Sequence, residues 1–178
     1  MSYQARDGEN ANSALIVTVT PKDFPEEGAL GGIAFQRDLE KKAWELGKGK
    51  VPVQLFGDFC AHQPSSQLGE IHPNIKGGYV LTDVRSILPK ELGDSIEEGI
   101  FAFGKKLSGF DRKDAVLSGI ESRTSSPVRL VRDQKGLSNI TGIYPCGEGA
   151  GYAGGITSAA MDGIKTAEWI ASEYMMKL

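Results

Sequence analysis

A glycine-rich loop near the C-terminal end is the feature that most constrains this chain. Residues 142–170 read GIYPCGEGAGYAGGITSAAMDGIKTAEWI, which predicts a short strand at Gly142–Cys146, a loop, and a helix from Ile156 to Met176. The loop satisfies G-x-G-x-x-G over residues 149–154. Such glycines let the backbone approach a pyrophosphate at a helix N-terminus. The pattern therefore predicts a strand–loop–helix unit that binds an anionic group.

This unit does not open a dinucleotide-binding domain. An opening unit is followed by a second strand, with an acidic ribose ligand about 20 residues after the glycines. Glu173 lies at that distance but falls inside the predicted last helix. The unit fits the closing strand and helix of such a domain better. On spacing alone, a small-residue loop that only lets a strand and a helix pack closely stays an open alternative.

The remaining chain predicts strands and helices of ordinary globular type. The strands are expected at Ser13–Thr20, Val51–Phe59, Val116–Thr124 and Val128–Val131, where β-branched residues gather between turn signals. Residues 61–78 are expected to form an irregular loop.

Apolar residues recur at helical spacing in two further segments, residues 33–46 and 90–107. We therefore expect an α+β fold derived from α/β. It would have a mixed sheet with two helices, followed by the terminal strand–loop–helix and lacking an N-terminal βαβ unit.

Charge and composition exclude several classes of protein. The formal net charge is −3, and 24% of the residues are charged, which argues against a nucleic-acid or anionic-membrane binder. The longest uncharged run, Gly149–Met161, is far shorter than the 18 or so residues that span a bilayer. The N-terminus has no apolar signal segment, and Cys60 and Cys146 form no C-x-x-C motif. These features predict a cytoplasmic protein without membrane segments.

Several isolated polar residues and one cysteine are not assigned to any functional site. His62 and His72 have no acidic or cysteine companions in a ligand pattern, so no metal site is expected. Asp83 and Arg85 are interpreted as solvated charges, and Cys146 as a small buried residue.

Three sequence blocks together resemble one protein family. They are YPCGEGAGYAGGI at 144–156, ESRTSSPVR at 121–129 and RDGENANSA at 6–14. In this order they resemble the C-terminal portion of a largely uncharacterised family of FAD-utilising dehydrogenases with a glutathione-reductase-like fold. The resemblance implies a longer protein in which residues 1–125 belong to a substrate or cap domain. Residues 126–178 would then complete the FAD-binding domain.

The resemblance also implies site residues in the full-length protein. Glu148 would contact the flavin ribityl chain, and the amides of Gly154, Gly155 and Ile156 would meet the flavin edge. The further implied cofactor contacts are Gly147, Gly149 and Arg123. The implied substrate contacts are Arg6, Asp7, Asn10 and Asn12, although a solvated loop is an equal alternative for them.

The expected function is therefore that of an oxidoreductase completed by this chain. FAD would be bound by the full-length protein and not by this part alone, and no catalytic residue is identified. The expected partners are the N-terminal part of the same protein and a small-molecule substrate, and the isolated chain is expected to self-associate through an unpaired sheet edge. The alternative is a self-standing α+β module that binds a phosphate or nucleotide without redox chemistry.

Overall fold

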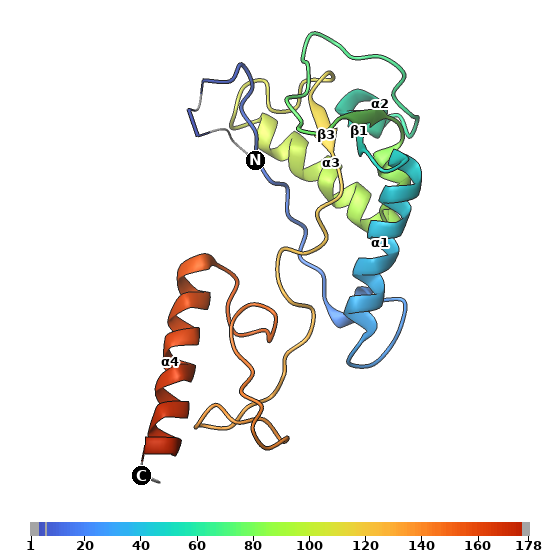
Figure 1. Ribbon diagram of the computed structural model, residues 1–178. Coiled ribbons are helices and arrows are strands. Elements are labelled where there is room, and N and C mark those ends of the chain that lie inside the picture. The colour runs from blue at the N-terminus through green and yellow to red at the C-terminus, as the bar shows by residue number, and fades with distance from the viewer. Residues whose placement is uncertain (1–3, 6, 176–178) are drawn as a thin grey trace. The chain divides into compact units, whose positions relative to one another are not determined.

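The computed structural model describes residues 4–5 and 7–175 and separates into two compact units (Figure 1). Unit 1 comprises the residues up to Lys22 together with Arg37–Glu121, and unit 2 comprises Asp23–Gln36 and the residues from Ser122 onward. The helices are α1 (Gly31–Gly47), α2 (Phe56–Cys60), α3 (Lys90–Gly104) and α4 (Ile156–Met175). The strands are β1 (Val51–Leu55), β2 (Tyr79–Leu81) and β3 (Val116–Ser118), and short 3-10 turns occupy Pro21–Asp23 and Val84–Ile87.

Unit 1 is built on a three-stranded mixed sheet in the order β2-β1-β3. β1 runs parallel to β2, with Val51 opposite Tyr79, and antiparallel to β3, with Leu55 opposite Val116. The central strand carries the core, because Val53 has no solvent exposure. This mixed sheet with its helices confirms the predicted α+β class.

The predicted helices are present as α1, α3 and α4. Their prediction succeeded because residues spaced three or four apart share one face of a helix, and that face is buried in α1 and partly buried in α3. In unit 1, Leu39 and Ala43 of α1 and Ile100 of α3 are buried. α3 packs on α2 through Phe101, whose ring centroid lies 5.1 Å from that of Phe56.

The strand predicted at Ser13–Thr20 is wrong. The segment is an extended chain without ladder hydrogen bonds, drawn in blue in Figure 1, and Ile16 is 72% exposed. β-branched composition produces a strand only where a neighbouring strand supplies hydrogen-bond partners and a surface to pack on. Among the described residues, no strand pairs with the segment Ser13–Thr20.

Two strands predicted in unit 2, at Val128–Val131 and Gly142–Cys146, are also absent. Their backbone groups bond elsewhere. Leu130 N donates to Ala150 O at 3.1 Å, and the carbonyl of Pro145 accepts from the Arg132 guanidinium at 2.8 Å. Proline has no N–H to give to a ladder, so a terminal strand ending Y-P-C has few groups left to pair. The predicted terminal strand–loop–helix is thus a loop followed by α4.

The ends of two other predicted strands are corrected. The segment Val51–Phe59 leaves the sheet after Leu55 and becomes α2, whose Phe56 and Phe59 are buried. The segment Val116–Thr124 pairs only as far as Ser118. Within residues 61–78, predicted as a loop, no helix or strand is found.

Arg85 was interpreted as a solvated charge, and this is wrong. Its side chain is 8% exposed and donates to Asp94 at 2.5 Å and to Glu97 at 2.6 Å. Asp83 accepts from the Ser86 amide at 3.2 Å and so caps the short 3-10 turn that follows. A buried guanidinium requires such carboxylate partners, because an unpaired charge in the interior is too costly.

Candidate functional site

The glycine loop of unit 2 folds into a compact turn before α4. The amide of Tyr152 donates to the carbonyl of Gly147 at 3.0 Å, and that of Gly151 to Glu148 at 2.9 Å. Gly147 and Gly151 have φ of 71° and 80°, the left-handed region that side-chain-bearing residues avoid. Glycine is therefore required at both positions for the backbone to turn.

The loop is packed on the segment that precedes it by about twenty residues. A Cβ added to Gly151 would lie 2.5 Å from the carbonyl oxygen of Val128, so the two backbones are in direct contact. The hydroxyl of Tyr152 donates to Leu130 O at 3.0 Å. Ser126 Oγ lies 3.1 Å from Gly149 O. The glycine loop is thus hydrogen-bonded to the block at residues 121–129.

A largely buried ion pair connects this loop to α4. Arg132 forms two hydrogen bonds with Asp162, of 2.6 and 2.9 Å, and the two side chains are 9% and 13% exposed. Asp162 also accepts from the amide of Gly147 at 2.9 Å. The first glycine of the loop is therefore fixed to the second turn of α4 through one carboxylate.

Arg132 also covers the ring of Tyr152. Its guanidinium carbon lies 3.6 Å from the centroid of that ring and 5.1 Å from that of Trp169. Arg129 lies 4.3 Å from the same Tyr152 centroid. Cation–π contacts of this kind add to the attraction at a partly desolvated site. Tyr152 is thus part of the packing that holds the loop.

The Arg132 guanidinium and then the Gly147 amide lower the pKa of Asp162 to about 2. Asp162 titrates near 3.9 in an unfolded chain, so its contribution to stability is complete above that pH. The contribution is lost as the pH falls through the folded-state pKa.

We therefore expect unit 2 to lose about 1–2 kcal/mol of stability from this group between pH 5 and pH 2, a figure reduced for screening by nearby solvent. Urea unfolding measured across this pH range tests the expectation. Asp162→Asn should remove this part of the pH dependence, and an unchanged profile in that variant would contradict it.

A shallow hollow of about 300 Å³ opens beside the loop. It is lined by Ser125, Ser126 and residues 151–154. A Cβ added to Gly154 or Gly149 would meet nothing within 4 Å. Among the described residues, the amides of Gly154 and Ile156 donate to no other protein group. The hollow therefore presents open backbone beside the N-terminus of a long helix.

Other predicted cofactor contacts are already engaged or exposed. The amide of Gly155 donates to Ser158 Oγ at 3.1 Å, and that of Gly147 to Asp162. Glu148 and Arg123 are exposed on the surface of unit 2. Of the three amides predicted to meet the flavin edge, those of Gly154 and Ile156 therefore remain available to a ligand.

The predicted substrate contacts belong to unit 1. Asp7, Asn10 and Asn12 are exposed, and the side-chain amide of Asn10 donates to His72 O at 2.6 Å. Arg6 lies outside the described residues. The role of this cluster in substrate binding stays a prediction.

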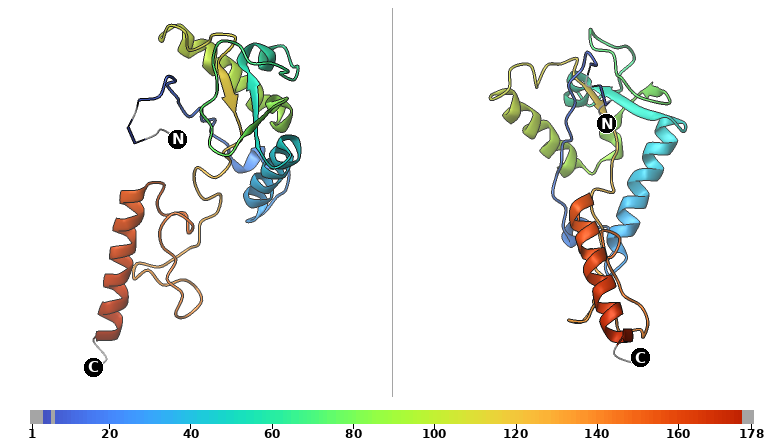
Figure 2. Two further views of the ribbon diagram at one scale, coloured as in Figure 1. Left: turned by 45° about the horizontal axis from the view of Figure 1, so that its top comes forward. Right: turned by 60° about the vertical axis from the view of Figure 1, so that its left-hand side comes forward.

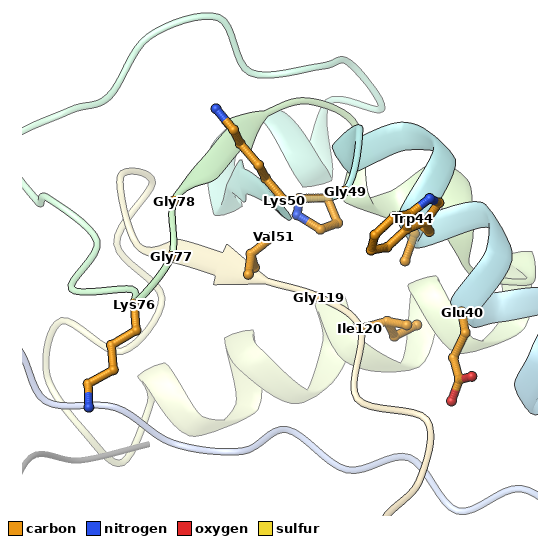
Figure 3. Close-up of a pocket in the computed structure, with 12 residues that line it drawn as sticks. Glu40, Trp44, Gly49, Lys50, Val51, Lys76, Gly77, Gly78, Gly119 and Ile120 are labelled. Carbon is orange, nitrogen blue, oxygen red and sulfur yellow. The ribbon is translucent and has the colours of Figure 1, made fainter.

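A second cavity, of about 370 Å³, lies in unit 1 and was not anticipated from the sequence (Figure 3). The end of α1 and the start of β1 contribute Trp44 and Val51, and Ile120 follows β3. Trp44 is 69% exposed. Figure 3 shows Lys50 and Lys76 pointing away from one another, so the cavity does not focus positive charge on one point.

Other kinds of site are absent from the part of the chain that the structure describes. No cluster of three or more His, Cys, Asp or Glu side chains is arranged to hold a metal ion there. Within the same residues, no helix has the length and apolar character needed to cross a membrane. Cys146 is exposed, so the prediction of a buried cysteine at this position is wrong. Cys60 is half-buried, and this burial raises the pKa of its thiol.

Comparison with known proteins shows the family of this chain. Residues 1–124 match the model of a family described as FAD-dependent protein, C-terminal domain-like. An uncharacterized protein of Clostridium beijerinckii is 51% identical over 177 residues, which is 98% of this chain and 33% of that relative. The chain thus spans about a third of the length of the curated relative that it matches, and the glycine loop follows the matched region.

Proposed function

Because this chain belongs to the FAD-dependent protein family, as its C-terminal domain-like part, we propose that it completes a dehydrogenase-type FAD-dependent oxidoreductase. The observation that carries the proposal is the family match over residues 1–124. The 51% identical relative is about three times as long as the segment shared with this chain, so the proposal assigns most FAD contacts to the rest of the polypeptide. This part alone is then inactive.

The hollow of unit 2 fits an anionic, planar cofactor edge. Helix α4 has 20 residues, and its N-terminus carries a partial positive charge that stabilises an adjacent anion. The free amides of Gly154 and Ile156 are at this end, and the bare backbone at Gly154 lets a ligand approach closely. When bound, FAD supplies the transfer of a hydride or an electron pair.

The side chains of this loop would bind and orient that cofactor. The exposed carboxylate of Glu148 would accept hydrogen bonds from the ribityl hydroxyl groups. Arg132 and Asp162 would keep Gly147 fixed, so that the loop need not become ordered when the cofactor binds. A small-molecule substrate bound by the polar cluster Asp7, Asn10 and Asn12, and a cytoplasmic location, remain parts of this proposal.

A methyl group at Gly154 tests the proposed site. In the full-length protein, we expect Gly154→Ala to weaken FAD binding by about ten-fold or more, because the methyl group fills the space that the flavin edge would occupy. The same variant should unfold at an unchanged urea concentration, since the added Cβ meets no protein atom within 4 Å. FAD titration followed by visible flavin absorbance measures the first effect.

Gly163→Ala is the matched control for this experiment. Gly163 lies within α4, and a Cβ there also meets nothing within 4 Å, yet the site is two turns away from the hollow. The Gly163→Ala variant should bind FAD with the same affinity as the unmodified protein. If Gly154→Ala also binds FAD normally, the flavin does not approach this loop. If the full-length protein stays colourless after FAD is added, the flavin assignment fails altogether.

A further inference from the structure

Helix α4 presents one side, with both polar and apolar residues, to its own unit. The loops of unit 2 lie along one side of the helix (Figures 1 and 2), where Asp162 bonds to Arg132 and Thr166 is buried. The partly or fully buried positions of α4 are Ala159, Asp162, Gly163, Thr166, Trp169, Ile170 and Glu173. Their spacing of three or four residues places them on one stripe of the helix.

A second stripe of α4 is apolar and exposed. We call it the outer stripe, and its members are Ile156, Ala160, Ile164, Ala167, Ala171 and Met175. Ile156, Ile164 and Met175 are 94%, 63% and 74% exposed. The spacing of four, four, three, four and four residues keeps the members on one face at 3.6 residues per turn.

The outer stripe differs from the faces of the other long helices. In α1 the apolar stripe is buried through Leu39 and Ala43, and in α3 Ile100 is buried although Phe101 and Phe103 are 44% and 47% exposed. The charged residues of α4 all lie off the outer stripe; they are Asp162, Lys165, Glu168 and Glu173. The stripe extends for roughly 30 Å along a 20-residue helix. A contiguous apolar surface of this kind marks a contact face.

We infer that the outer stripe of α4 packs against the part of the full-length polypeptide that lies outside this chain. The argument is the length of that part, because the segment that matches this chain is only 33% of the 51% identical relative. Ala160, Ala167 and Ala171 leave the middle of the stripe flat, which lets an apolar sheet or helix face approach closely, with Ile156 and Ile164 beside them. The inference rests on the proposed function only for the existence of that longer protein.

Cysteine labelling of the full-length protein tests the inference. Ala167→Cys places a thiol in the middle of the outer stripe, and Ser172→Cys places one on the same helix but off the stripe. Both replaced residues are small and exposed in the structure, so they form a matched pair. If the stripe is covered, maleimide should modify Cys at 167 at least about 100-fold more slowly than Cys at 172, because labelling then requires local opening.

The outcomes separate the possible occupants. Slow labelling at position 167 that is independent of protein concentration supports the inference. Equal rates at the two positions overturn it, and so does protection that disappears on dilution, because the occupant is then a second copy. If Ala167→Cys does not fold, hydroxyl-radical footprinting of Ile164 in the unmodified protein tests the same inference. Protection of Ile164 from oxidation supports the inference, and oxidation at the rate of an exposed residue overturns it.

FAD absorbance recorded on the same samples keeps the two proposals apart. A protected stripe in a protein that binds no FAD would retain the contact face and remove the flavin assignment. A protein that binds FAD but is labelled rapidly at position 167 would retain the flavin assignment and overturn the inference about the outer stripe.

Discussion

We expect the replacement of Arg132 by methionine to destabilise unit 2 by about 3–5 kcal/mol, because the change leaves the Asp162 carboxylate without its cation. The variant loses the two hydrogen bonds to Asp162, of 2.6 and 2.9 Å, and the bond of 2.8 Å to the carbonyl of Pro145. It also loses the guanidinium that covers the Tyr152 ring. Native-state hydrogen exchange in urea, measured on peptides covering residues 156–170 of the full-length protein, gives the free energy directly.

Two further variants decide whether the unpaired charge is the cause. Adding Asp162→Asn to Arg132→Met should restore part of the lost stability, because no buried charge then lacks a partner. Lys42→Met is the surface control. It removes an ion pair with Asp38 of 2.7 Å whose side chains are about half exposed, 50% and 48%, and should cost less than about 1 kcal/mol. Equal costs for Arg132→Met and Lys42→Met would contradict the assignment.

Gly151→Ala should destabilise the glycine loop by about 2–4 kcal/mol, by adding a left-handed backbone penalty to a steric one. Gly151 has φ of 80°, and the new Cβ would lie 2.5 Å from Val128 O and 3.1 Å from the Cα of Arg129. Both neighbours are backbone atoms, so neither can rotate out of the way. The same exchange experiment, on peptides that cover residues 147–155, measures the loss.

Gly147→Ala separates the two contributions. Gly147 has φ of 71°, but a Cβ there meets nothing within 4 Å, so this variant carries only the backbone penalty of about 1–2 kcal/mol. The difference between the two variants is then the cost of separating the loop from the segment at Val128. If both variants lose the same amount, the close approach at Gly151 is not energetically important.

The helices of this protein were predictable because their evidence is local. Leu39 and Ala43 lie four residues apart and share a buried face, so the sequence alone shows the period. The strands were predicted only in part, because pairing depends on residues far away: β1 and β3 lie within the predicted segments Val51–Phe59 and Val116–Thr124. Ser13–Thr20 has the composition of a strand but pairs with no other strand among the described residues, whereas Tyr79–Leu81 pairs with β1 although it is only three residues long.

The candidate site was predicted in part. The glycine pattern located the loop and the helix that follows it, and the structure adds the contact between Ser126 and Gly149. Arg132 and Asp162 were missed, because they are thirty residues apart and each resembles an ordinary surface charge in the sequence. A pattern search detects spacing within one segment, and an ion pair between two segments leaves no such spacing.

The bonds of Asp162 limit how this region can change during evolution. One carboxylate serves both the amide of Gly147 and the guanidinium of Arg132, so substitution of either charged residue alone leaves the other largely buried and unpaired. Homologous sequences should therefore change positions 132 and 162 together, or retain both. Between such homologues, a chimera joined between these two positions would inherit mismatched halves of the pair, and the productive crossover points lie before residue 132 or after residue 162.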